Sequence, residues 1–192
     1  EDKNITHVDG EINPVKDAEI INLELILADL ESVSKRILKC EKLLKTNDKK
    51  NKEQYELLIE IKKDLESGNL IDINKFSNED KKIVNQFQLL STKPIFYIAN
   101  ISEDGTSDEQ LSILQKFATE SNTTVIPASI KIEQEIASLE NEERIEYLEL
   151  MGMDEPVLNK IIFKGYQILG LETYFTAGPS ELRAWTIQKD SL

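Results

Sequence analysis

The clearest pattern in the chain is a hydrophobic repeat that begins after Pro14. Apolar residues recur at alternating intervals of three and four positions over three heptads: Leu23, Ile26, Leu30, Val33, Ile37, Cys40 and Leu44. This spacing predicts one long helix with a narrow apolar stripe. Asn13 is suited to cap this helix, because proline is favoured at the first helical position and Pro14 follows directly.

A second helical pattern follows the polar segment Thr46–Asn51. Leu58, Ile61 and Leu65 share one face, and Gly68 is placed to end the helix. Two apolar stripes joined by a short polar turn predict an antiparallel helical hairpin. We expect the hairpin to project, because a stripe this narrow does not suit a helix buried on all sides. Two helices of an ordinary bundle are the alternative interpretation.

After Pro94 the pattern changes from helical to strand-like. Ile95–Ala99 is a continuous apolar run, which is typical of a strand buried on both faces, and Thr123–Pro127 is a second short strand. A helical pattern follows each of these runs. Strand, helix, strand and helix in this order predict a parallel sheet. In the preceding segment, Ser77 is a cap-like start for a short helix through Phe87.

The last fifty residues combine helices with a predicted β-hairpin. Glu142–Glu149 and Glu155–Leu171 have helical patterns. Tyr174–Ala177 and Arg183–Ile187 are β-prone runs on either side of a Gly-Pro pair. They predict the opening hairpin of a small β-containing module.

Composition restricts the possible functions. The chain has 192 residues and a net charge of −13, so it is a poor nonspecific ligand for nucleic acid or anionic membranes. One Cys and one His exclude a disulfide framework within the chain and Cys/His zinc sites. No apolar run is long enough for a membrane span and no signal peptide is visible, so we expect a cytoplasmic protein without a membrane partner. Because the chain begins with Glu1 rather than Met, we expect a piece of a longer chain.

Basic residues concentrate in the predicted hairpin. The stretch Lys35–Lys63 contains five acidic residues and ten basic ones, a local net charge of +5. The basic residues are Lys35, Arg36, Lys39, Lys42, Lys45, Lys49, Lys50, Lys52, Lys62 and Lys63. This asymmetry favours a polyanionic partner such as RNA, although a solvated helix face has a similar composition.

The chain lacks the motifs of several catalytic classes. It contains no G-x-x-x-x-G-K-[ST] loop, no G-x-G-x-x-G loop and no credible Ser/His/Asp set, so we expect no catalytic residue and no metal ligand in it.

One pair of loops is a candidate ligand site. The carboxyl ends of parallel strands form the ligand-binding edge of an open sheet, which brings the loops Asn100–Glu103 and Pro127–Ser129 together. The Asn100 amide offers both a donor and an acceptor to the edge of a purine. The Ile101 backbone would lie beside the ring, and Ser129 could donate its backbone N–H. Asn after a strand is also a common turn residue.

Three segments in the same order resemble the Obg-like ATPase (YchF) family. The run Leu171–Gly178, followed by Arg183–Ile187, closely resembles the junction into the family's TGS domain. The stretch Asn13–Leu25 resembles the start of the family's helical hairpin. Lys93-Pro94 with Tyr97–Asn100 resembles its base-recognition strand. Together these matches cover nearly the whole chain.

The resemblance implies an α/β fold of defined organisation. The chain would form the C-terminal half of the parallel sheet of a P-loop NTPase. An antiparallel α-helical hairpin (a coiled coil) would be inserted into it, and the start of a β-grasp TGS domain would follow. Residues 1–13 and 88–172 would form the second part of the nucleotide-binding domain, residues 14–87 the inserted hairpin, and residues 173–192 the beginning of TGS.

The resemblance also implies an ATP-binding and ATP-hydrolysing switch protein that uses Mg²⁺. Relatives that bind GTP carry Asn-Lys-x-Asp, whereas the matching positions here, Asn100 to Glu103, have the Asn-x-x-Glu form of a family that prefers ATP to GTP. Asn100, Ile101 and Ser129 would contact adenine, and Glu103 would mark the specificity. The P-loop and Mg²⁺ ligands would precede Glu1, so we expect the chain alone to be inactive. A noncatalytic module that docks on the ribosome or RNA through the basic hairpin is the alternative.

Overall fold

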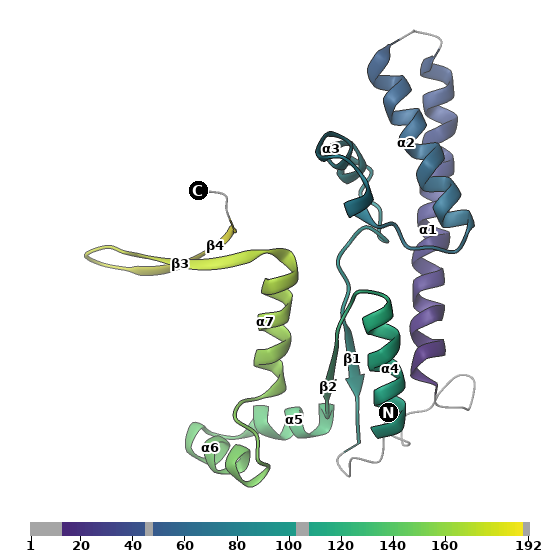
Figure 1. Cartoon of the computed structure of the whole chain (residues 1–192). Coiled ribbons are helices and arrows are strands. Elements are labelled where there is room, and N and C mark those ends of the chain that lie inside the picture. Colours follow the sequence, from purple (N-terminus) through teal and green to yellow (C-terminus); the bar gives the residue numbers. More distant parts are fainter. Residues whose placement is uncertain (1–12, 45–47, 103–107, 190–192) are drawn as a thin grey trace. The chain divides into compact units, whose positions relative to one another are not determined.

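The chain forms two compact units. The structure is a computed structural model that describes residues 13–44, 48–102 and 108–189. One unit is Val15–Pro94, and the other contains the residues from Ile95 onward (Figure 1). We describe each unit by itself.

Two helices form the framework of the first unit. Helix α1 (Pro14–Leu43) and helix α2 (Lys49–Glu66) lie side by side in antiparallel directions (Figure 1), which confirms the predicted helical hairpin. Asp48 caps α2 by accepting a hydrogen bond from the Lys50 N–H at 3.0 Å. Beyond α2, Gly68 has φ +78°, a left-handed conformation that suits glycine after a helix end.

The apolar stripe of α1 is buried over its central and C-terminal parts. The residues that form the core with α2 are Ile26, Val33, Ile37, Cys40, Leu57, Leu58, Ile61 and Leu65. Leu23, the first member of the predicted stripe, is 52% exposed. At 1.5 Å per residue, the 30 residues of α1 extend well beyond the 18 residues of α2, so α2 has no side chain to cover this end.

The segment after α2 covers the hairpin. It contains the 3-10 helix η2 (Ile73–Lys75) and helix α3 (Asn78–Gln86). The Ser77 hydroxyl accepts a hydrogen bond from the Asp80 N–H at 3.1 Å, which confirms the predicted cap. Side chains of this segment complete the core: Ile71, Phe76, Val84, Phe87 and Leu89. The hairpin is therefore not bare, because one side of it is packed against this segment.

Lys75 connects η2 to α2 through an ion-pair network. Its ammonium group pairs with Asp64 and Glu60. Partial burial alone would lower the pKa of Lys75, but hydrogen bonds and charges from Asp64 and Glu60 outweigh it and raise this pKa above its ordinary value. The Lys75 charge therefore persists throughout the neutral pH range.

A buried carboxylate holds the end of the first unit against α1. Asp29 is 3% exposed, and its carboxylate accepts hydrogen bonds from the Leu90 N–H at 2.8 Å, the Ser91 N–H at 2.7 Å and the Ser91 hydroxyl at 2.6 Å. Seven residues later on α1, the Arg36 guanidinium donates to the Phe87 carbonyl at 3.1 Å. These contacts fix both ends of residues 87–91 to one helix.

The second unit begins with a small parallel sheet. Strand β1 (Tyr97–Asn100) pairs in parallel with strand β2 (Val125–Ala128), and helix α4 (Asp108–Glu120) connects them. The predicted parallel sheet is confirmed. The first strand begins two residues later than Ile95, and the expectation of burial on both faces is wrong, because Ile98 is 46% exposed. Among the described residues this sheet has only two strands, and the residues around it leave Ile98 about half exposed.

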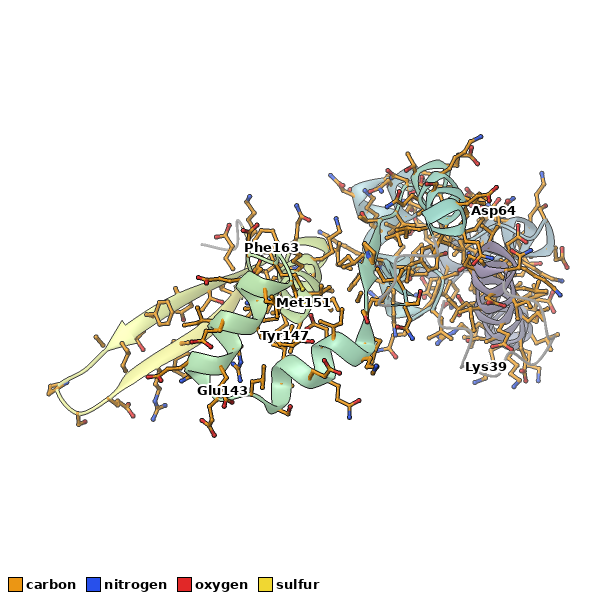
Figure 2. All side chains as sticks on the ribbon, turned by 90° about the horizontal axis from the view of Figure 1, so that it is seen from below. Lys39, Asp64, Glu143, Tyr147, Met151 and Phe163 are labelled. Atoms are coloured by element: carbon orange, nitrogen blue, oxygen red, sulfur yellow. The ribbon has the colours of Figure 1, made fainter. Side chains whose placement is uncertain are left out.

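Three helices and a hairpin complete this unit. They are α5 (Ile130–Ser138), α6 (Asn141–Leu150), α7 (Val157–Leu169), β3 (Leu171–Ala177) and β4 (Leu182–Gln188). β3 and β4 are antiparallel, which confirms the predicted hairpin. Figure 2 shows Met151 after α6 and Phe163 on α7; they are 40% and 71% exposed. None of the described helices is both long and apolar enough to cross a membrane.

Replacing Asp29 tests its role in holding residues 90–91. We expect Asp29→Asn to lower the free energy of unfolding by about 2–4 kcal/mol, because it removes a buried charged acceptor and turns an amide donor toward backbone donors. Urea unfolding followed by circular dichroism measures the change. Glu31→Gln, which alters an exposed carboxylate on the same helix, should leave the unfolding midpoint unchanged. Equal midpoints for the two variants would contradict this role.

Candidate functional site

The candidate site lies where the two parallel strands end. Asn100 is the last residue of β1 and lies opposite Ala128, the last residue of β2. Directly beyond them, the Ile101 N–H donates to the Ala128 carbonyl at 3.0 Å. The loops that follow the two strands therefore begin side by side, as expected for neighbouring parallel strands.

Ser129 caps helix α5. Its backbone is extended, and its hydroxyl accepts from the Ile132 N–H at 3.5 Å while its carbonyl accepts from the Glu133 N–H at 3.0 Å. The side chain is 9% exposed. The hydroxyl is thus committed to the helix, and the group that Ser129 can offer to a ligand is its backbone N–H.

The Asn100 side chain is held by the first residue of α5. Its amide oxygen accepts a hydrogen bond from the Ile130 N–H at 3.3 Å. This N–H has no partner within the helix, because the first N–H groups of any helix lack an intrahelical acceptor. A backbone donor can only face the amide oxygen, so the interaction fixes the orientation of the amide and presents its NH₂ group as a donor.

The group that the Ile101 backbone can offer to a ligand is its carbonyl. Its N–H is used by the Ala128 carbonyl, so its own carbonyl is the atom available to accept. The amide donor of Asn100 suits N7, which is an acceptor in both purines. A backbone carbonyl suits the N6 amino group of adenine and repels the O6 acceptor of guanine. The described part of the site can thus offer a ligand one amide donor from Asn100 and one carbonyl acceptor from Ile101.

Not every predicted position is described. Glu103, the expected specificity marker, lies outside the described residues. Asn100, Ile101 and Ser129 are brought together at one edge of the sheet. Within the described ranges, no three His, Cys, Asp or Glu side chains form a group that could hold a metal ion.

The sequence interpretation missed Ile130 as a partner of Asn100. Ser129 before an apolar helical pattern was a sufficient signal for a cap, and a cap places the next N–H at the start of a helix. The contact itself joins residues 30 positions apart. It depends on the register between β1 and β2, which no local pattern fixes.

The positive charges of the basic hairpin are partly balanced by neighbouring acidic side chains. Lysines pair with acidic residues four positions away at Glu31–Lys35, Lys49–Glu53, Lys52–Glu56 and Lys62–Glu66. The hydrogen bond and charge of Lys35 lower the pKa of Glu31. Residues 35–52 nevertheless contain eight basic and two acidic residues. Positive charge is therefore concentrated toward the end of the hairpin where α1 meets α2. Lys39, one of these basic residues, is labelled on α1 in Figure 2.

Comparisons with known proteins agree with these features. No protein-family model matches the chain. The ribosome-binding ATPase YchF of Bacillus subtilis (strain 168) is 46% identical over 98% of this chain and 52% of that protein. The YchF protein of Escherichia coli O157:H7 is 39% identical over 97% of this chain and 52% of that protein. The solved structure of the Schizosaccharomyces pombe YchF GTPase matches with a TM-score of 0.83 and 32% identity, covering 98% of this chain and 53% of that chain.

The fold and these matches define an α/β protein with the architecture of about half of a P-loop GTPase-like chain. The sequence similarity extends over nearly the whole chain, and the chain spans about half the length of the curated relatives it matches. The chain belongs to the YchF family and corresponds to about half of a family member, which confirms the resemblance found in the sequence.

Substitution of Asn100 tests how the site is held. We expect Asn100→Ala to speed hydrogen exchange of the Ile130 N–H about fivefold, because a hydrogen bond worth about 1 kcal/mol is lost. Asn100→Asp keeps an oxygen acceptor at the same position and should keep the protection. Exchange monitored by ¹⁵N NMR measures both variants. Unchanged exchange in Asn100→Ala would show that the amide does not hold this residue.

Proposed function

We propose that the chain is the base-recognition half of an ATP-binding and ATP-hydrolysing P-loop switch protein, with residues 173–192 as the start of a TGS domain. The observation that carries the proposal is the orientation of the Asn100 amide, whose oxygen is held by the Ile130 N–H so that its NH₂ group is a donor. The curated relatives are named ribosome-binding ATPases, which supports the same activity. The protein would act in the cytoplasm.

In this proposal, each residue has a limited role. Asn100 donates to N7 of the purine, and the Ile101 carbonyl accepts from the N6 amino group of adenine. Ser129 donates its backbone N–H to the far edge of the ring. Glu103 stands where relatives that bind GTP have the Asp that accepts from the N1–H and N2 amino group of guanine. Adenine lacks this pair of donors, so Glu103 would mark the preference for ATP without contacting the base.

The chemistry of hydrolysis belongs to residues outside this chain. The sequence has no Gly-rich phosphate loop, so contacts to the phosphates and to Mg²⁺ would come from the other half of a family member. Those contacts supply most of the positioning and charge stabilisation for phosphoryl transfer. The chain alone therefore selects the base but does not hydrolyse the nucleotide.

A second candidate function is docking on the ribosome through the hairpin. The favouring observation is the excess of positive charge in residues 35–52, within a chain whose net charge is −13. The relatives named ribosome-binding ATPases are consistent with it. In this role the lysines contact phosphates without reading bases, because the stretch lacks the interleaved aromatic side chains that stack on bases.

A nucleotide titration tests the first function. We expect a longer family member that includes the phosphate loop to bind fluorescently labelled ATP more tightly than labelled GTP, and this chain to bind both weakly. The double change Ile101→Lys with Glu103→Asp in the longer protein should reduce the preference for ATP, because it restores the guanine-binding pattern Asn-Lys-x-Asp. An unaltered preference in the double variant would refute the proposed role of Glu103 as the residue that marks the preference for ATP.

A salt series tests the second function. We expect binding of the chain to isolated ribosomes to weaken steeply with salt. Changing Lys49, Lys50 and Lys52 to Gln should flatten the plot of log K against log salt by about two units. Replacing Lys62, Lys63 and Lys81 by Gln is the matched control, because it removes the same charge away from residues 35–52. Equal slopes for the two triple variants would exclude docking through this end of the hairpin.

A further inference from the structure

The Glu133 carboxylate joins two helices of the second unit. It projects from the first turn of α5, and its two oxygens accept hydrogen bonds from the first two residues of α7: the Val157 N–H at 2.7 Å and the Leu158 N–H at 3.1 Å. Helix α7 is preceded by Pro156, which supplies no side-chain cap. Glu133 therefore satisfies two N–H groups that α7 itself leaves without partners and places a negative charge at the positive end of that helix.

Glu133 is free for this contact because its own helix is capped by another residue. The Ser129 hydroxyl accepts from the Ile132 N–H. Glu133 is one position beyond the residue that completes a reciprocal capping box. Its side chain is thus not required at the start of α5, although it lies in the same turn as Ile130.

The contact closes a ring of three elements, one of which, α5, begins at the candidate site. β2 continues through Ser129 into α5, Glu133 ties α5 to the start of α7, and α7 in turn contacts β2. One side of this ring is the covalent connection from β2 to α5, and another is the contact of α7 with β2. The Glu133 side is a specific polar contact, and it fixes how α5 is rotated relative to α7.

This rotation determines where the Ile130 N–H points. Ile130 is three residues before Glu133 on α5, and its N–H holds the Asn100 amide oxygen. We propose that Glu133 is a positioning residue for base recognition: by fixing α5 against α7, it keeps the Asn100 amide in the orientation that presents its NH₂ group to a purine. The proposal rests on the base-recognition function given above.

The test uses the chain labelled with ¹⁵N, adenosine as the probe, and variants of two glutamates. Glu133→Ala removes both acceptors, and Glu133→Gln keeps one neutral acceptor in nearly the same shape. Glu135→Gln is the matched control, since Glu135 lies on the same helix but accepts from the Tyr147 hydroxyl of α6 at 2.5 Å. Two quantities are measured for each variant: hydrogen exchange of the Ile130, Val157 and Leu158 N–H groups, and the adenosine dissociation constant from shifts at Asn100 and Ile101.

We expect Glu133→Ala to speed exchange of all three N–H groups at least fivefold and to weaken adenosine binding at least threefold. Glu133→Gln should show smaller changes of the same sign, and Glu135→Gln should match the unsubstituted chain. If Glu133→Ala fails to fold, Glu133→Gln still tests the positioning role, because glutamine has nearly the same shape as glutamate.

Two different results would contradict the positioning role of Glu133 and the base-recognition function separately. Loss of Val157 and Leu158 protection in the Glu133 variants, with unchanged Ile130 exchange and unchanged adenosine binding, would show that Glu133 caps α7 without positioning Asn100. The absence of any adenosine-dependent shift at Asn100 or Ile101 in the unsubstituted chain would instead refute the proposed base-recognition function.

Discussion

The register of the parallel pair β1 and β2 is the constraint on which the candidate site depends. Asn100 lies opposite Ala128, and only in this register does the Asn100 side chain meet the N–H of Ile130. Side chains alternate between the two faces of a strand, so a shift of one residue would turn Asn100 to the other face. The same register brings the Ile101 N–H to the Ala128 carbonyl, which leaves the carbonyl of Ile101 as the acceptor.

The local patterns of the sequence predicted the elements, and the polar contacts between distant residues were not predictable from them. The two hairpin helices, the parallel strands and the final β-hairpin follow from hydrophobic spacing and from caps such as Ser77. Asp29 accepts from Ser91, 62 positions away, and Glu133 accepts from Val157, 24 positions away. A single acidic residue in a helix gives no sign of such a partner, because most acidic residues lie on solvated faces.

The same reasoning explains where the predictions for the strands were wrong. An apolar run such as Ile95–Ala99 indicates burial on both faces only if further layers cover the sheet. In the described part of this chain the sheet has two strands, and Ile98 remains 46% exposed. The position of Asn100 at the edge of the sheet was predicted better than the burial of the strand that carries it. Its position depends on the order of strand and helix, whereas burial depends on everything packed around them.

In the proposed base-recognition role, the Asn100 site would contribute selectivity but little affinity, and the physical reason is the chemistry of its groups. Its groups are a neutral amide and backbone atoms, and each net hydrogen bond to such groups is worth about 1 kcal/mol. In the proposed role only the Ile101 carbonyl distinguishes adenine from guanine, because N7 is an acceptor in both purines. One such hydrogen bond gives about fivefold discrimination, while even millimolar affinity requires about 4 kcal/mol of binding free energy. A half-protein with a net charge of −13 also repels phosphates. In the proposed function, tight binding of a triphosphate would thus require cationic contacts from another segment, and the neutral site would select the base.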